Sequence, residues 1–140
     1  MRPTRSSERT TVVRWLAIVP TAMLVWWGML LFGVFLDTLA VRYCPSDALI
    51  SGFCTATWFQ PLERGIIVGC AGLTGFLIVF CASAVAPAQR RLVAWAMFLA
   101  GLLVVGMMGY QTGAYYECTA AIGAGLCGVF AVVKLLPPTA

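Results

Sequence analysis

Charged residues are scarce in this chain, and histidine and asparagine are missing altogether. Only 10% of the 140 residues are charged while 61% are hydrophobic. The basic residues are eight arginines and a single lysine, Lys134. A soluble domain is roughly half apolar and about a quarter charged. The core of a 140-residue protein cannot bury so many apolar side chains. The composition therefore indicates that lipid surrounds much of the protein.

The absences also exclude kinds of site. Without histidine, the chain lacks the commonest metal ligand and the side chain most used as a general base. No two cysteines have C-x-x-C spacing, so the sequence predicts no metal site and no cofactor. The few arginines near the N-terminus suit an orientation signal and contact with anionic lipid. We therefore expect a protein that is not an enzyme and does not bind nucleic acid.

Long apolar stretches are what the sequence has instead. A membrane-spanning helix needs about 20 mostly apolar residues, and four candidates meet this length: 11–36, 61–84, 92–114 and 118–136. Helices joined by short connections usually lie side by side and run in opposite directions. The predicted fold is an all-α integral membrane protein, an antiparallel bundle of four transmembrane helices. Residues 11–140 would form this single domain, and residues 1–10 a flexible cytoplasmic tail.

Basic residues near the ends of these stretches orient the chain, because lysine and arginine are enriched in cytoplasmic segments. If the chain crosses the membrane four times, seven of its nine basic residues lie on one side: Arg2, Arg5, Arg9, Arg14, Arg90, Arg91 and Lys134. We therefore expect both termini in the cytoplasm. The scarcity of asparagine and lysine favours a bacterial origin, and hence the bacterial inner membrane.

Cysteines are divided between a loop and the apolar stretches. Cys44 and Cys54 lie in the segment 37–60, which the orientation places outside the cytoplasm, where disulfides persist. We predict that a Cys44–Cys54 disulfide closes this first extracytoplasmic loop, with a contribution of about 2–3 kcal/mol. Cys118 is either free or the partner of one loop cysteine. The three cysteines inside the spans are expected to behave as small apolar residues.

Four spans with cytoplasmic termini and outer-loop cysteines resemble the quinone-linked disulfide oxidases of the bacterial envelope. This resemblance implies thiol–disulfide exchange. That family carries a C-x-x-C pair in one outer loop and a second pair in the other. This chain offers Cys44 and Cys54, with nine residues between them, and Cys118 alone. An odd number of cysteines cannot complete such a relay, so thiol redox chemistry is the least favoured interpretation.

Small residues recur along the predicted helices, where they let helices approach closely in lipid. The helix-packing candidates are Gly65, Gly69, Gly109, Gly113, Ala120, Ala124 and Gly128. Gly65 and Gly69 have GxxxG spacing. Such residues serve either packing within the chain or a contact with another membrane protein.

The remaining polar residues gather near the predicted outer ends of the helices. This polar cluster comprises Asp37, Arg42, Glu63, Arg64, Gln111 and Glu117. Ionisable groups at membrane depth are costly and suggest a functional site or a paired structural one. We expect Glu63 to begin its helix, where the helix dipole favours a carboxylate, and Arg64 to pair with Asp37 or Glu117.

The favoured hypothesis is a non-enzymatic accessory, assembly or regulatory subunit. It would bind a larger membrane protein, or copies of itself, through its small-residue helix faces and its outer loop. The alternative is a small transporter or ligand-binding membrane protein centred on the polar cluster. Membrane lipid is the other expected partner.

Overall fold

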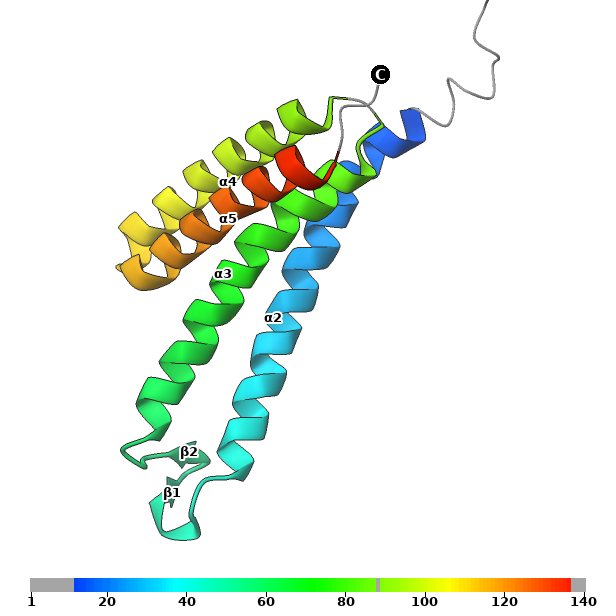
Figure 1. Cartoon of the computed structure of the whole chain (residues 1–140). Coiled ribbons are helices and arrows are strands. Elements are labelled where there is room, and N and C mark those ends of the chain that lie inside the picture. Colours follow the sequence, from blue (N-terminus) through cyan, green and yellow to red (C-terminus); the bar gives the residue numbers. More distant parts are fainter. Residues whose placement is uncertain (1–11, 88, 137–140) are drawn as a thin grey trace, which may run out of the picture.

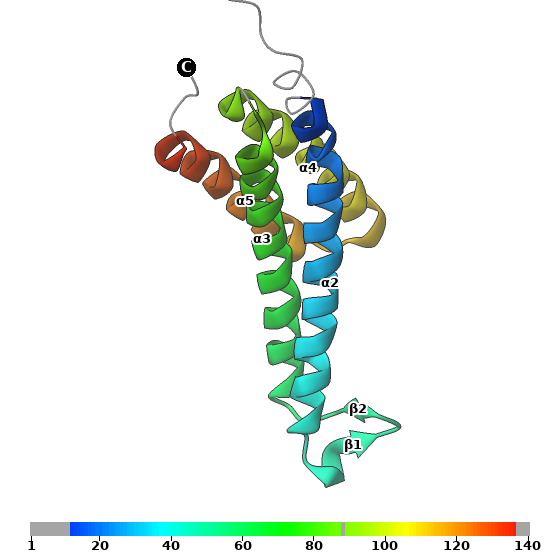
Figure 2. The ribbon, with the colours of Figure 1, turned by 90° about the vertical axis from the view of Figure 1, so that its right-hand side faces the viewer.

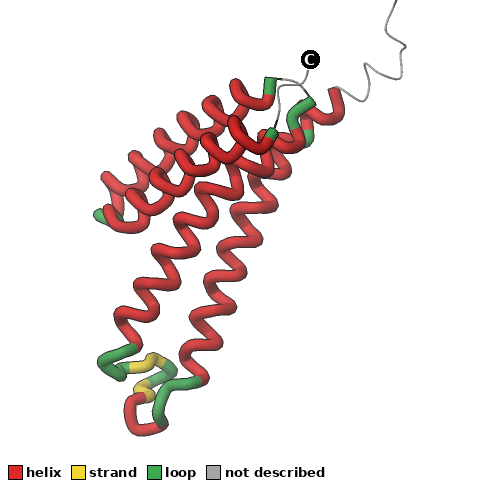
Figure 3. Tube along the Cα trace, viewed as in Figure 1, coloured by secondary structure: helices red, strands yellow, loops and turns green. Residues whose placement is uncertain are grey.

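The computed structural model describes residues 12–87 and 89–136, and the structure is 84% helical. Four helices are long and apolar enough to cross a membrane. They are α2 (Ile18–Arg42), α3 (Phe59–Val85), α4 (Arg90–Thr112) and α5 (Tyr115–Leu135), and Figure 3 shows how little of the chain lies between them. The prediction of a helical membrane protein is confirmed at this level. The predicted tail, residues 1–10, lies outside the described residues.

The first membrane helix is longer than the sequence predicts. The apolar run ends at Leu36, but the helix continues to Arg42 and spans 31 residues in all, Val12–Arg42. Residues 37–42 stay helical because they gain contacts there: Ala40 packs against Phe59 and Cys54. The predicted loop 37–60 is therefore wrong at both ends, and the true connection is 43–58.

An interruption near the beginning of this helix has its cause in Pro20. Residues 12–16 are helical, Ala17 departs from the regular pattern, and α2 follows. Proline has no N–H for the carbonyl four residues earlier, and its ring crowds that carbonyl. Thr21 bonds to the Ala17 carbonyl through its backbone N–H at 3.0 Å and its hydroxyl at 2.7 Å. In Figure 1 the dark blue first turns bend away from the axis of α2, as the proline predicts.

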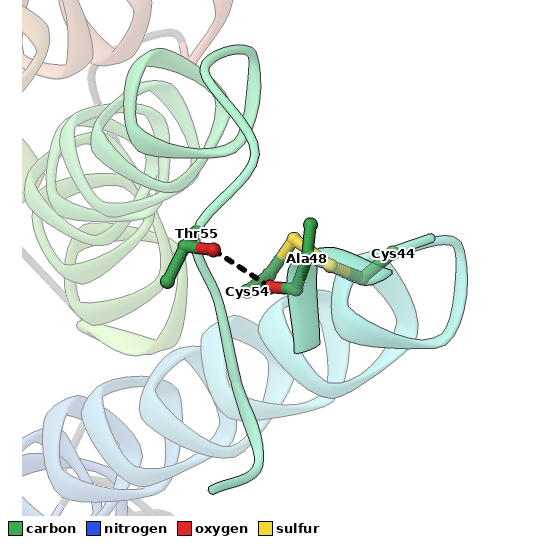
Figure 4. The surroundings of a disulfide bond; sticks show 4 residues. All are labelled: Cys44, Ala48, Cys54 and Thr55. Carbon is green, nitrogen blue, oxygen red and sulfur yellow. Dashed lines mark hydrogen bonds between the residues drawn. A yellow bond between two sulfur atoms is a disulfide. The ribbon is translucent and has the colours of Figure 1, made fainter. Parts of the chain in front are cut away.

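A disulfide-closed hairpin connects α2 and α3. Its strands, β1 (Leu49–Ile50) and β2 (Phe53–Cys54), pair antiparallel after a 3-10 turn at Ser46–Ala48. Ser51 and Gly52 between them both have positive φ, 50° and 86°, as a two-residue hairpin turn requires. The predicted disulfide is confirmed: Cys44 and Cys54 are joined, with Cα atoms 5.9 Å apart, and Figure 4 shows the bond beside Ala48 and Thr55.

The helices lie as two pairs. α2 runs beside α3, and α4 beside α5, with α3 making contacts to all three other helices and the most extensive ones to α5. We call the end with residues 43–58 the hairpin end and the end near residues 12 and 136 the terminal end. Figures 1 and 2 show that the α4–α5 pair diverges from α2 and α3 toward the hairpin end. The halves of α2 and α3 nearest the hairpin are therefore left open on that side.

Buried side chains concentrate at the terminal end. There, small and β-branched residues of all four helices form two adjoining clusters: Ile18, Val79, Ala82, Ala86, Val93, Ala94, Val129 and Val132. A separate small cluster at the hairpin end ties the loop to the helices through Ala40, Cys54 and Phe59. The region between these clusters holds the features of functional interest.

Candidate functional site

The closest helix contact joins α3 to α5 and depends on glycine. A Cβ added at Gly75 would collide with the carbonyl oxygen of Ala121, and one added at Gly128 would lie 3.0 Å from the carbonyl oxygen of Phe76. Backbone atoms cannot yield as flexible side chains do. The two helices can therefore approach this closely only because these positions lack a side chain. Gly128 was predicted as a packing residue, whereas Gly75 was not. Gly75 could have been found from Gly72, which lies three residues earlier on the same helix.

The predicted packing residues Ala120, Ala124 and Gly109 also lie at helix contacts. A Cβ at Gly72 would stand 3.5 Å from the Ala120 carbonyl oxygen and 3.7 Å from the Ala124 Cβ, so both alanines face α3. Gly109 on α4 faces α5, where a Cβ would meet the Cys118 sulfur at 2.9 Å. The Cys118 thiol is free and donates to the Val105 carbonyl at 3.4 Å. Of the two alternatives for this cysteine, the structure shows the free thiol.

Gly113 has a different role from the predicted one. It follows the last residue of α4 with φ +70°, and its N–H bonds to the Gly109 carbonyl at 2.9 Å. No atom would lie within 4 Å of an added Cβ. Glycine ends helices in this left-handed conformation because it has no Cβ to clash. Gly113 therefore terminates α4 and does not pack against another helix.

Gly65 and Gly69 face open space. A Cβ at either position would meet nothing within 4 Å. Beside them, a groove of about 390 Å³ runs between α2 and α3 at their hairpin ends. Its lining is apolar: Phe32, Leu36, Pro61, Leu62, Gly65, Ile66, Gly69, Cys70 and Leu73. We call it the α2–α3 groove. The GxxxG pair thus remains without the close helix neighbour that its spacing predicts.

A second groove lies between α3 and α5 and shares Pro61 and Gly65 with the first. It has a volume of about 760 Å³ and is lined by Pro61, Arg64, Gly65, Val68, Tyr116, Thr119 and Ala120. We call it the α3–α5 groove. Arg64 lies over the ring of Tyr116, with its guanidinium carbon 5.0 Å from the ring centre. The expected ion pair of Arg64 with Asp37 or Glu117 is replaced by this cation–π contact.

The polar cluster is more dispersed than its sequence positions suggest. Arg42 ends α2 and Gln111 lies near the end of α4, both exposed to the surroundings. The expectation that Glu63 begins its helix is wrong, because α3 begins at Phe59 and has no acidic residue in its first turn. In α5 the first turn does carry an acidic residue, Glu117, and the helix dipole favours a carboxylate there. Because the α4–α5 pair diverges from α2 and α3 toward the hairpin end, the end of α4, with Gln111, is set apart from the end of α2, with Arg42.

Asp37 is the member of this cluster with an unsatisfied atom. It lies within α2, where one carboxylate oxygen, Oδ1, is buried and has no hydrogen-bond partner in the described part of the chain. Leaving a buried polar atom unpaired costs about 1–3 kcal/mol. The first span therefore carries a carboxylate that the shorter predicted span did not include.

Comparison with known protein families, with curated proteins and with solved structures gives no match. Within residues 12–87 and 89–136, no three histidine, cysteine, aspartate or glutamate side chains are grouped so that they could hold a metal ion. The features of this chain that bear on function are the two grooves, the hairpin and the partly buried carboxylate of Asp37.

Proposed function

We propose that this chain is a non-enzymatic accessory, assembly or regulatory subunit that binds a larger membrane protein. The α2–α3 groove would receive a transmembrane helix of that partner, and the disulfide-closed hairpin would supply a second contact. The observation that carries this proposal is the open GxxxG pair, Gly65 and Gly69, beside an apolar groove.

Gly65 and Gly69 stand apart from the other open glycines because they are one helical turn apart and both line an apolar groove. In a helix interior, glycine is about 1 kcal/mol less favourable than alanine, and lipid chains would cover a leucine equally well. Small residues give an advantage where another helix approaches, because close packing replaces the hydrophobic effect as the attraction between helices in lipid. α3 already shows this use at Gly75, against α5. The same helix offers a second small-residue face that no part of the described chain covers.

The hairpin supports the proposal from outside the apolar spans. Large apolar side chains stand exposed on it, with Tyr43 at 76%, Ile50 at 61% and Phe53 at 77% of their full accessible area. The disulfide and the tight turn hold this short segment in one conformation, which lowers the entropy lost on binding. A rigid loop that displays aromatic side chains is suited to contact with a protein partner.

The proposal includes a membrane arrangement. The four helices would form an antiparallel up-down-up-down bundle in a bacterial inner membrane, with the terminal end in the cytoplasm and the hairpin outside. The support is the charge distribution: Arg14, Arg90, Arg91 and Lys134 all belong to the terminal end, as expected for cytoplasmic segments. The hairpin would then lie where disulfides persist.

Photo-crosslinking in native membranes tests the proposal. A photoreactive residue in place of Leu62, which lines the α2–α3 groove, should capture another protein. The same residue in place of Leu103 on α4, 76% exposed and outside both grooves, should capture lipid. Mass spectrometry of the product distinguishes a second copy of this chain from a different protein.

A matched pair of variants gives the test a second readout. Gly69→Ile should abolish co-purification of the partner, while Gly101→Ile should preserve it. Both glycines have nothing within 4 Å of an added Cβ, but Gly69 lines the groove and Gly101 does not. Equal co-purification with both variants, or capture of lipid alone at both positions, would reject the proposal.

A small transporter is the second candidate function, and Asp37 is the observation that favours it. An unpaired carboxylate oxygen on a membrane helix is a candidate proton or cation site, and Asp37 has one. This candidate requires no protein partner. Recovery of the chain from native membranes with no cross-linked or co-purified protein would therefore favour the transporter over the subunit.

A further inference from the structure

The α3–α5 groove has a polar end and an apolar floor. Going from the hairpin end into the span, α3 presents Arg64 before Val68, and α5 presents Tyr116 before Ala120. Because a helix rises about 1.5 Å per residue, the apolar side chains lie about 6 Å deeper than the polar ones. We propose that this groove binds a phospholipid with an anionic headgroup, its phosphate at Arg64 and an acyl chain along the floor.

Charge is the first argument for this occupant. Arg64 is the one charged residue that lines the groove, and Glu63, its neighbour in sequence, projects about 100° away on the same helix. Contact with the Tyr116 ring holds the guanidinium at the groove. Within the described residues, the guanidinium donates no hydrogen bond to the protein. Its N–H groups are therefore free to form bidentate hydrogen bonds with a phosphate.

Position is the second argument. α5 begins at Tyr115, so the positive end of its dipole lies at the same end of the groove as Arg64. Both lining helices are apolar enough to span a membrane, so the floor of the groove continues toward hydrocarbon depth. A soluble anion would leave this apolar floor uncovered, whereas a lipid covers it. The α3–α5 groove shares Pro61 and Gly65 with the α2–α3 groove, but Arg64, Val68 and the α5 residues line it alone. The lipid proposal rests on those residues and does not depend on the proposed function.

Native mass spectrometry of the full chain tests the proposal. The detergent-solubilised protein is mixed with equal amounts of phosphatidylglycerol and phosphatidylcholine that carry the same acyl chains. Wild-type protein should retain phosphatidylglycerol over phosphatidylcholine by about fivefold, the preference expected for one basic side chain near an anionic headgroup. Arg64→Gln should bring the ratio close to one, and Arg64→Lys should preserve most of it.

Two controls separate a built site from diffuse attraction. Arg42 is also an exposed arginine at the hairpin end, but it does not line the groove, so Arg42→Gln should keep the wild-type ratio. Val68→Trp should fill the apolar floor and reduce retention of both lipids, while Leu103→Trp on α4 should not. A ratio near one in the wild type, or an equal loss in Arg42→Gln and Arg64→Gln, would overturn the proposal. Retention unchanged by Val68→Trp would do so as well.

Discussion

Gly75 and Gly69 stand six residues apart on α3, and their surroundings are opposite. A side chain at Gly75 would strike the backbone of α5 at Ala121, whereas a side chain at Gly69 would enter open space. Both positions are glycine in a helix that also carries large apolar residues such as Ile66, Leu73 and Phe80. Packing inside the chain therefore explains Gly75, and the proposed partner helix would explain Gly69.

Substitution separates these two roles. Gly75→Ile should destabilise the fold by about 1–3 kcal/mol, because the added side chain forces α3 and α5 apart. Gly69→Ile should leave stability within about 0.5 kcal/mol of the wild type, since the site is open. Thermal unfolding in mild detergent measures both, and Gly101→Ile on α4 serves as the control. A destabilised Gly69→Ile variant would show that this face is already filled within the chain.

At the scale of single elements, the hairpin is constrained by a disulfide and by hydrogen bonds across its base. Thr55 donates two hydrogen bonds to the Ala48 carbonyl oxygen, one from its backbone N–H at 2.9 Å and one from its hydroxyl at 2.8 Å. Figure 4 shows the hydroxyl bond beside the disulfide. Two-residue strands alone are marginal in water. The covalent bond and the packing of Cys54 against Phe59 therefore contribute most to holding the segment.

Removing the disulfide should loosen this element without dissolving the helices. The double variant Cys44→Ser, Cys54→Ser should lose about 2–3 kcal/mol of stability, the loop-closure contribution for a segment of this length. The thermal midpoint should fall, and proteolysis should become faster between Tyr43 and Trp58. Cys118→Ser is the control, because that thiol is free. An equal loss in the control would assign the effect to helix packing instead.

The sequence predicted the elements better than their ends. Apolar stretches identified all four long apolar helices, because each depends on composition within a short window. The disulfide could be predicted because two cysteines share one short loop. The ends were missed where contacts distant in sequence extend a helix, as Ala40 and Phe59 do at the hairpin end. The stacking of Arg64 on Tyr116 was missed for the same reason. Spacing showed which glycines share a face, but it could not show that Gly72 meets a helix and Gly69 does not.

Across the whole molecule, the two ends are built differently. The terminal end carries the buried clusters that join all four helices, and Arg14 donates from its Nε to the Val85 carbonyl at the end of α3, at 3.2 Å. Basic side chains near a helix C-terminus are favoured by the dipole. The hairpin end carries both grooves and the exposed aromatic residues. The proposed orientation thus places the tightly packed, basic end inside and the open end outside.

Reporter fusions test this orientation directly. An enzyme that is active only outside the cytoplasm should be inactive when fused after Ala140 and active when inserted between Ser51 and Gly52, the exposed turn of the hairpin. The orientation depends on lysine and arginine at the terminal end. Arg91→Gln combined with Lys134→Gln, two exposed residues of that end, should therefore raise the fraction of inverted chains.

Arg42 and Arg64 provide the contrast, because they lie at the hairpin end, where basic residues oppose the proposed orientation. Replacing both by glutamine should sharpen the orientation, or leave it unchanged if it is already complete. An active C-terminal fusion together with an inactive hairpin fusion would show that the chain has the opposite orientation. The hairpin disulfide would then have to persist in a reducing compartment, contrary to the usual distribution of such bonds, so one experiment tests the charge argument and the cysteine argument together.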